Sequence, residues 1–288
     1  MDTLLPYAPL LTPILNLALT LALPLLLALY IHTDYTTFLS LGPGGTPSTP
    51  LGYLKIKLLS LVSLRDPLRP LPIPPHFRPQ KGHLDPSTIP SRPGTRPIVR
   101  GIAPQRQKTQ RSSPRVYSSL VAALRGLAKN PGNSVEERTS CFEKHSSGLF
   151  ASVPITRTCG GEVCHAHPSD GSLHLTLHPA DVAVLLERGW GERHPLAKGG
   201  WFRRFVPREF VLVYAPRTEG EVRVVMEIVG AAVWWVSGVH VRREGEGESQ
   251  KRVEIEDERF REGNECWSCT TDGCGSGGAR LETMVDDA

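Results

Sequence analysis

A long stretch without formal charge near the N-terminus places the strongest constraint on this chain. No Asp, Glu, Lys or Arg occurs from Thr3 to Thr33, where Leu, Ala, Ile and Pro dominate. Its densest part, Ile14 to Ile31, reaches the roughly 18 to 20 residues with which a helix spans a bilayer core. Pro24 lies inside it, and membrane helices tolerate proline. The sequence therefore predicts a membrane-spanning helix, with residues 1–33 as an anchor.

Two alternatives to an anchor fit the same stretch less well. A cleaved signal peptide would begin with basic residues and end in a small-residue motif, whereas this chain opens on Asp2 and leaves the stretch at Tyr30-Ile31-His32. A buried core helix would rarely stay uncharged over such a length. The nearest basic residues, Lys55 and Lys57, weakly favour a cytosolic main domain. We expect a single-pass membrane protein of the endoplasmic reticulum whose main domain faces the cytosol.

Residues 34–115 are expected to form a membrane-proximal, Pro-rich basic region. Leu51 to Leu64 has the pattern of a short amphipathic helix, which could lie on the membrane surface or dock on the main domain. Residues 66–104 contain 11 prolines, so an extended wrap or linker is expected there. Residues 65–129 carry 13 Lys or Arg against two acids, but the net charge of the chain is only +4, and we predict no nucleic-acid partner.

The main domain is expected over residues 116–240, where helical and strand patterns alternate. An α+β fold is predicted, a compact domain with a small mixed or antiparallel sheet and packed helices. The expected helices are Val116–Lys129, Pro179–Arg188 and a helix that opens on the capping box Thr218-Glu219-Gly220-Glu221 and runs to about Trp235. The expected strands are Glu162–His167, Ser172–His178 and Phe210–Tyr214.

The last residues, 241–288, differ in composition from the rest. They carry 13 acids against seven bases and few apolar residues, which predicts a disordered acidic tail. Cys266 and Cys269, together with Cys274, resemble half a zinc knuckle in this tail, but no fourth ligand has the right spacing, and we interpret them as incidental.

Histidines gather on the two expected strands that precede Pro179. If residues 168–171 form a four-residue hairpin loop, His165 lies opposite His174, and His167 shares their face. Directly opposed Cβ atoms lie roughly 5 Å apart, so the imidazoles could share a proton, a ligand or a metal. His178 should point the same way but lie about 13 Å farther along the strand.

Three uses of this histidine face stay open at the level of sequence. Three imidazoles could hold Zn, Cu or Fe, although no HExxH helix accompanies them. They could instead perform metal-free acid–base chemistry, because histidine titrates near neutral pH. The third use is a hydrogen-bonded structural face. Acid–base chemistry and a structural face are both favoured over a metal, so no metal is expected at these histidines.

Two other segments carry residues suited to a site. The segment Gly189–Leu196 places Trp190, Arg193 and His194 between glycines and a proline, which suits a loop over a pocket or a Trp that anchors the chain to the core. Tyr214 and Arg217 leave a strand end, where the Arg could meet an anionic substrate or simply be solvated. The chain has no GxGxxG after a strand, no GxxxxGK[ST] and no GxSxG, which disfavours dinucleotide enzymes, P-loop enzymes and common esterases.

Short motifs follow one another in a characteristic order from residue 34 to residue 236. The strongest are Leu173-His174-Leu175, Gly189–Leu196 and Tyr214-Ala215-Pro216-Arg217, with others at Asp34–Leu39, Gly42-Pro43, Gly52-Tyr53, Gly94–Pro97, Gln105–Gln110 and Phe142–His145. In these motifs the chain resembles the fungal luciferase family and its wider set of luciferase-domain proteins.

The resemblance implies an anchored oxygenase of fungal specialised metabolism that needs no organic cofactor. Fungal luciferases add O2 to a hydroxylated styryl-pyrone, 3-hydroxyhispidin. The loop Pro168–Gly171 differs from that of the light-emitting members, so the expectation covers O2 addition to a hydroxypyrone or polyketide-like phenol and leaves light emission aside. The expected partners are this small molecule, O2 and the membrane; the oligomeric state is left open.

The expected site residues follow from what such chemistry needs: a base, a cation or donor for an enolate, and a dry pocket. The catalytic candidates are His165, His167, His174 and His194, and the substrate-binding candidates are Glu143, His145, Trp190, Arg193, Tyr214 and Arg217. Two rival functions remain: a non-catalytic domain that binds a lipid or metabolite, and a metal-dependent hydrolase or dioxygenase.

Overall fold

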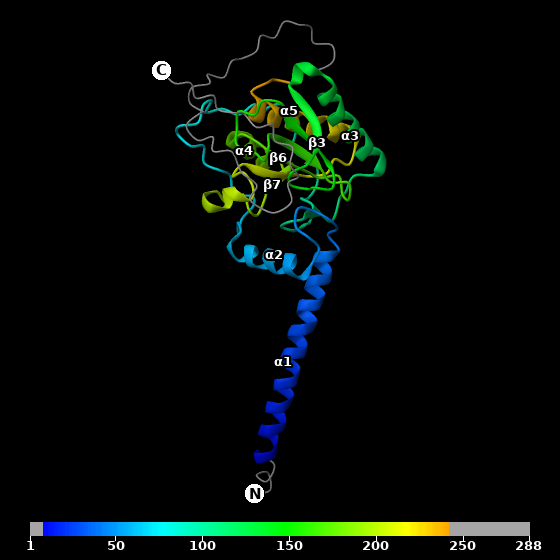
Figure 1. The fold of residues 1–288 in the computed structure, drawn as a ribbon, viewed down its shortest axis with the longest axis vertical. Helices are drawn as coiled ribbons and strands as arrows, with labels where there is room; N and C mark the ends of the chain where they lie inside the picture. Colours follow the sequence, from blue (N-terminus) through cyan, green and yellow to red (C-terminus); the bar gives the residue numbers. More distant parts are fainter. Residues whose placement is uncertain (1–7, 242–288) are drawn as a thin grey trace, which may run out of the picture.

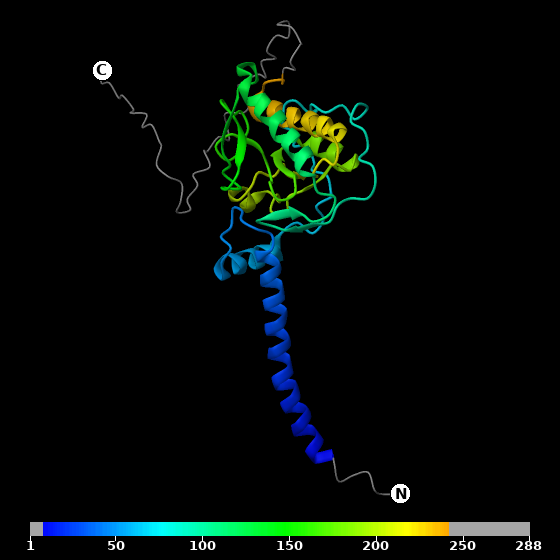
Figure 2. The same cartoon turned by 90° about the vertical axis from the view of Figure 1, so that its right-hand side faces the viewer.

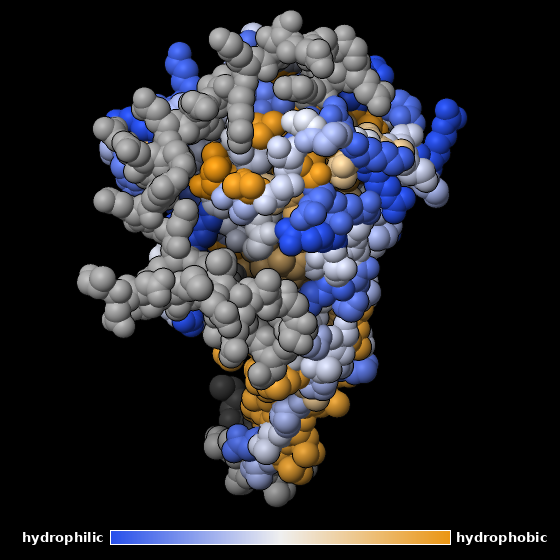
Figure 3. All heavy atoms as spheres, turned by 45° about the horizontal axis from the view of Figure 1, so that its top comes forward, coloured by the Kyte–Doolittle hydropathy of each residue, from blue (hydrophilic) through white to orange (hydrophobic). Residues whose placement is uncertain are grey.

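A computed structural model describes residues 8–241, in which a long helix carries an α+β domain (Figures 1 and 2). The helix α1 spans Ala8–Leu39. Its 25-residue segment Leu15–Leu39 is long and apolar enough to cross a membrane, and none of the most apolar part of this segment is buried. Figure 3 shows hydrophobic residues gathered along this stalk. The predicted helix is therefore present and ends six residues beyond the expected boundary. The predicted acidic tail and its cysteines lie outside the described residues.

The amphipathic helix α2, Pro50–Val62, lies across the end of α1, between α1 and the domain (Figure 1). Thr49 caps it, because its side chain accepts the amide N–H of Gly52. Tyr53 Oη donates to Asp34 of α1 over 2.5 Å, and Lys57 Nζ lies 2.5 Å from the same carboxylate. The two helices are thus held together at the top of the stalk.

The Pro-rich segment runs over the domain without regular structure until β1, Val99–Gly101, which pairs with β2, Gln105–Gln107. The predicted extended wrap is therefore confirmed. Its backbone groups are satisfied by the domain: Asp181 accepts the amide N–H groups of His83 and Leu84, and Trp190 donates its indole N–H to the carbonyl of Pro90.

A six-stranded antiparallel sheet forms the centre of the domain, in the order β3-β4-β5-β6-β8-β7. Its strands are β3 Val135–Thr139, β4 Ser147–Ala151, β5 Glu162–Ala166, β6 Leu173–Thr176, β7 Gly191–Arg193 and β8 Phe210–Val213. Two short 3-10 helices, Pro131–Asn133 and Gly200–Arg204, lie in the connections. The α+β prediction is confirmed, and of its two forms of sheet the antiparallel one is present.

The helices α3, Pro114–Lys129, and α5, Glu219–Ser237, pack against each other and against the sheet, and α4, Pro179–Glu187, precedes β7. As predicted, Thr218 caps α5 by accepting the amide N–H of Glu221. Residues Ile228 to Ser237 are all buried, which places the end of α5 in the main core. This arrangement leaves the opposite face of the sheet to the β1–β2 ribbon and the loops.

The prediction of a loop at Gly189–Leu196 is wrong in its central part. Gly191–Arg193 is the edge strand β7, paired with Val211–Val213 of β8. Gly189, with φ of 77°, ends the α4 segment in a left-handed conformation that favours glycine, so the chain returns at once along the free edge of β8. The anchoring alternative for Trp190 holds, since this side chain is 1% exposed in the core.

Candidate functional site

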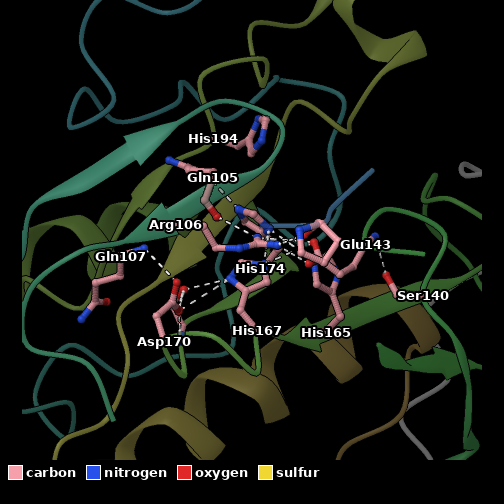
Figure 4. A network of polar contacts seen from close by, with 12 residues as sticks. Gln105, Arg106, Gln107, Ser140, Glu143, His165, His167, Asp170, His174 and His194 are labelled. Atoms are coloured by element: carbon pink, nitrogen blue, oxygen red, sulfur yellow. Dashed lines mark hydrogen bonds and ion pairs between the residues drawn. The ribbon is translucent and has the colours of Figure 1, made fainter. Parts of the chain in front are cut away.

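The hairpin β5–β6 has the predicted register. His165 is the direct partner of His174, and the amide N–H of His167 donates to the carbonyl of Ser172 over 2.8 Å. The three imidazoles lie on the sheet face away from α5, below the β1–β2 ribbon, as Figure 4 shows. All three are buried, at no more than 5% exposure.

His178 does not share this face, which corrects the prediction. The strand β6 ends at Thr176, and His178 becomes the N-cap of α4, where its Nδ1 accepts the amide N–H of Ala180. The change of backbone direction at the cap turns its ring toward α5, with its centroid 4.7 Å from that of Trp235.

One nitrogen of each cluster imidazole faces the same point. Nε2 of His167 lies 3.1 Å from Nδ1 of His174, which lies 3.3 Å from Nε2 of His165. The three nitrogens fall within 4.8 Å of one another. We call His165, His167 and His174 the histidine cluster.

The outer nitrogen of His165 is held by Glu162, a residue the sequence reasoning missed. Nδ1–H of His165 donates to the Glu162 carboxylate over 2.6 Å, and that carboxylate also accepts Ser140 Oγ–H and the amide N–H of Cys141, each over 2.7 Å. Regular alternation would place residues 162 and 165 on opposite faces. The register of β5 shifts by one residue opposite Leu149 and Phe150, and this irregularity brings Glu162 to the face of His165.

The outer nitrogen of His174 is held through Gln105 of β2. The Gln105 amide Nε2–H donates to Glu192 over 3.1 Å, so its Oε1 accepts Nε2–H of His174 over 3.0 Å. Glu192 also accepts the phenol of Tyr214 over 3.1 Å. Tyr214, a predicted substrate contact, therefore acts on the cluster through two intervening side chains, and burial raises the pKa values of Glu192 and of its own phenol.

The outer nitrogen of His167 is held by Ser172. Ser172 Oγ–H donates to Asp170 over 2.6 Å, so the same oxygen accepts Nδ1–H of His167 over 2.9 Å. Asp170, in the hairpin loop, also accepts the amide N–H of Gln107 in β2 over 3.0 Å. Burial raises the pKa of this carboxyl. The hairpin loop and the β1–β2 ribbon are thus joined beside the cluster.

These contacts settle the tautomers of the cluster. Each ring donates its outer N–H to a carboxylate, an amide oxygen or a hydroxyl, so in the neutral state each inner nitrogen presents a lone pair. Burial lowers the pKa of His167 and of His174 well below the usual value, and the neighbouring histidines lower both pKa values further. The inner nitrogens of His167 and His174 therefore lie close together, and Nε2 of His165 faces them over 3.3 Å.

A buried ion pair borders the cluster. Arg106 Nη2 binds Glu143 Oε1, and Arg106 Nη1 lies 3.4 Å from Glu143 Oε2, which is 4.0 Å from Nε2 of His167. Both side chains are at most 7% exposed. Glu143 was predicted from the sequence and lies at the site; Arg106, its partner, was missed.

A cavity of about 600 Å³ opens onto the cluster. His165, His174, Gln105, Glu143 and Phe210 line its buried part, and α2 contributes one wall. His194 also lines it, with its ring centroid 5.2 Å from that of His174. Both His194 nitrogens bind backbone groups, because Nε2–H donates to the carbonyl of Ile102 and Nδ1 accepts the amide N–H of Leu196. Burial lowers its pKa to about 3.

Five predicted substrate contacts do not line this cavity: Tyr214, described above, and four others. Trp190 is in the core, and Arg193 donates to the backbone carbonyls of Arg69 and Ala197. Arg217 pairs with Glu221. His145 is exposed and lines a second cavity of about 300 Å³ beside α3.

The missed residues share one property, because each orients a cluster histidine, directly or through Ser172, or pairs with Glu143; they are Glu162, Gln105, Arg106, Asp170 and Ser172. The sequence carried two signals for them: the motif Gln105–Gln110, whose first three residues form β2, and the expected hairpin loop 168–171, which contains Asp170.

The fold and the site define an α+β domain with a buried polar pocket behind an apolar helix, and the comparisons with known proteins are specific. A Luciferase domain matches residues 160–232, which run from β5 into α5. The Neonothopanus nambi luciferase is 34% identical over 229 residues, covering 72% of this chain and 81% of the relative. The luciferases of Armillaria gallica and Armillaria mellea are also 34% identical, and each is covered to 82%. No solved structure matches. The chain belongs to the fungal luciferase family.

Proposed function

We propose that this protein is a membrane-anchored oxygenase that adds O2 to a small hydroxypyrone or polyketide-like phenol. The observation that carries the proposal is the cavity on the histidine cluster in a chain whose relatives are luciferases. Such a substrate reacts with O2 as an electron-rich enolate. The site must therefore bind an anion in a pocket that excludes water.

The charges around the cavity fit an anionic substrate. Four basic side chains line it, Lys55, Lys144, Arg157 and Arg204, against the single acid Glu143, which Arg106 already neutralises. Nε of Arg157 is buried and has no hydrogen-bond partner among the described residues. This donor is therefore available to an enolate or carboxylate oxygen. At the buried end, the Phe210 ring stacks on that of His174 with centroids 5.1 Å apart and offers a flat apolar surface to an aromatic substrate.

Membrane attachment is part of the same proposal. Besides α1, the helix α2 exposes Leu51, Leu54, Leu58 and Leu61, one face at helical spacing, while Ile56 and Leu59 line the cavity from its other face. We infer that α2 lies on the membrane surface, in the endoplasmic reticulum and on the cytosolic side. A lipophilic phenol held at that surface would then be close to the cavity.

The test is O2 consumption by the full-length protein in detergent with a panel of hydroxypyrones. We expect uptake with the wild type, a loss of at least roughly 10²-fold in His174→Ala, and a milder effect in His178→Ala, because the second histidine lies on the other face of the sheet. Binding of a pyrone without O2 uptake by the wild type would replace the proposal with a non-catalytic, metabolite-binding function.

A further inference from the structure

We propose that His165, His167 and His174 bind one divalent first-row transition-metal ion through the three nitrogens that face one another. This inference goes beyond the proposed function, because metal binding can be measured with no substrate present. It rests on the hydrogen bonds of the cluster, on the distances within it and on the groups behind it.

The hydrogen bonds of the cluster use the outer nitrogen of each ring and provide no cation for the three inner nitrogens at the centre. Glu162, Gln105 and Ser172 accept the three outer N–H groups, so as neutral rings the three histidines would direct their remaining lone pairs at one another, over 3.1 and 3.3 Å. Lone pairs at that separation repel unless a cation lies between them. A single proton would not satisfy all three nitrogens, because a hydrogen bond joins one donor to one acceptor and leaves the third nitrogen without a partner.

The distances suit a metal ion. Imidazoles that bind a tetrahedral ion at about 2.0 to 2.1 Å place neighbouring nitrogens roughly 3.3 Å apart. Two of the separations, 3.1 and 3.3 Å, lie close to this value, and the whole set lies within 4.8 Å, so small side-chain movements would complete the triangle.

The groups behind the cluster are those of a built metal site. Histidine ligands commonly donate their other N–H to a carboxylate or another oxygen, which orients the ring and raises its basicity. Glu162 does so directly, Asp170 acts through Ser172, and Glu192 orients Gln105.

The donor set narrows the class of ion. Three neutral imidazoles suit Fe, Co, Cu or Zn and disfavour Mg and Ca, which prefer oxygen ligands. His165 and His174 line the cavity, so the remaining coordination positions face it. In a step that rests on the proposed function, these positions would take the two neighbouring oxygens of a hydroxypyrone enolate.

The decisive experiment is metal binding by full-length protein in detergent. The protein is stripped with a chelator and titrated with Co²⁺, whose visible bands report nitrogen coordination, and bound Co²⁺ and Zn²⁺ are counted by elemental mass spectrometry. We expect one equivalent in the wild type and in His178→Ala. A triple variant, with alanine at 165, 167 and 174, should bind none at this site.

Milder variants guard against loss of the fold. Glu162→Ala should weaken Co²⁺ binding roughly 10- to 100-fold, and Glu162→Gln, which keeps an acceptor for His165, should recover most of it. A wild type that binds no Co²⁺ or Zn²⁺, or binds them as well as the triple variant does, would overturn the metal site.

An O2-uptake measurement separates this inference from the proposed function. If O2 uptake persists in chelator-treated, metal-free protein, the metal takes no part in the reaction and the proposed oxygenase function stands. If the protein binds one equivalent of metal but takes up no O2 with any pyrone, the metal site stands and the proposed oxygenase function is rejected.

Discussion

At the scale of single residues, the site depends on buried polar groups that satisfy one another. Each cluster histidine is oriented by another buried side chain, and only Gln105, the partner of His174, comes from a distant part of the chain. The Arg106–Glu143 ion pair lies beside the cluster. Such groups are costly to bury singly, because an unpaired charge or donor loses its hydration without compensation. Removal of one partner should therefore cost more than removal of both.

Replacement of Arg106 tests this expectation. Arg106→Met leaves the Glu143 carboxylate buried and unpaired, so we expect a loss of roughly 3–5 kcal/mol in unfolding free energy. For a domain of this size that corresponds to a fall in Tm of roughly 6 to 20 °C, measured by calorimetry. The double variant Arg106→Met/Glu143→Leu should regain much of the loss. Equal destabilisation of the single and double variants would contradict the pairing.

The acid sensitivity of the fold should depend on His178. Burial against Trp234 and Trp235 lowers the pKa of this imidazole to about 4, whereas the unfolded chain has a pKa near 6.5. Between these pH values only the unfolded state takes up the proton, so stability is lost as the pH falls from about 6.5 to 4. His178→Asn keeps an N-cap acceptor without the titrating ring. Its Tm should fall less than that of the wild type over this range, and parallel Tm curves would refute the assignment.

At the scale of elements, irregular backbone sets the direction of the functional side chains. The register shift in β5 turns Glu162 to the cluster, and the end of β6 at Thr176 turns His178 away from it. The β1–β2 ribbon then supplies Gln105, Arg106 and Gln107 from above the sheet (Figure 4). The site is therefore assembled from a sheet and a ribbon that are far apart in the sequence.

The cap of α5 contributes to the stability of the core helix. Thr218 Oγ1 accepts the amide N–H of Glu221 over 3.2 Å, so Thr218→Ala should cost about 1 kcal/mol, or roughly 2–4 °C in Tm. The matched control is Ser118→Ala, an exposed hydroxyl on α3 that binds only a carbonyl of its own helix. Its Tm should stay within about 1–2 °C of the wild type. Equal losses in the two variants would show that the cap contributes nothing specific.

At the scale of the whole molecule, the stalk α1 and the helix α2 lie at one end of the domain (Figure 2), and residues of α2 line the cavity. Deletion of residues 1–33 removes most of the apolar stretch of α1 and leaves α2 with its exposed leucines. We expect the full chain to stay in the membrane pellet after a carbonate wash and the shortened chain to be released, because one apolar face binds a membrane reversibly. Recovery of the full chain in the carbonate supernatant would contradict the anchor.

Local physical chemistry made several features predictable from the sequence. The uncharged stretch, the prolines, the helix caps and the alternation around Pro168–Gly171 each depend on residues close together in the chain, and α1, the extended wrap, α5 and the register of His165 with His174 follow from them. A hairpin register in particular is determined by its loop and its alternation.

Tertiary structure alone decided which residues surround the histidines. Glu162 reaches His165 because a register shift interrupts an alternation, and Gln105 and Arg106 reach the site across the fold, 69 and 37 residues from His174 and Glu143. Trp190, Arg193 and Arg217, though prominent in the motifs, satisfy core and backbone contacts elsewhere. The sequence alone therefore determined the hairpin, because its loop and its strand alternation depend on residues that are close together in the chain. Only the folded chain decided the site, because burial and hydrogen bonding between distant segments select its members.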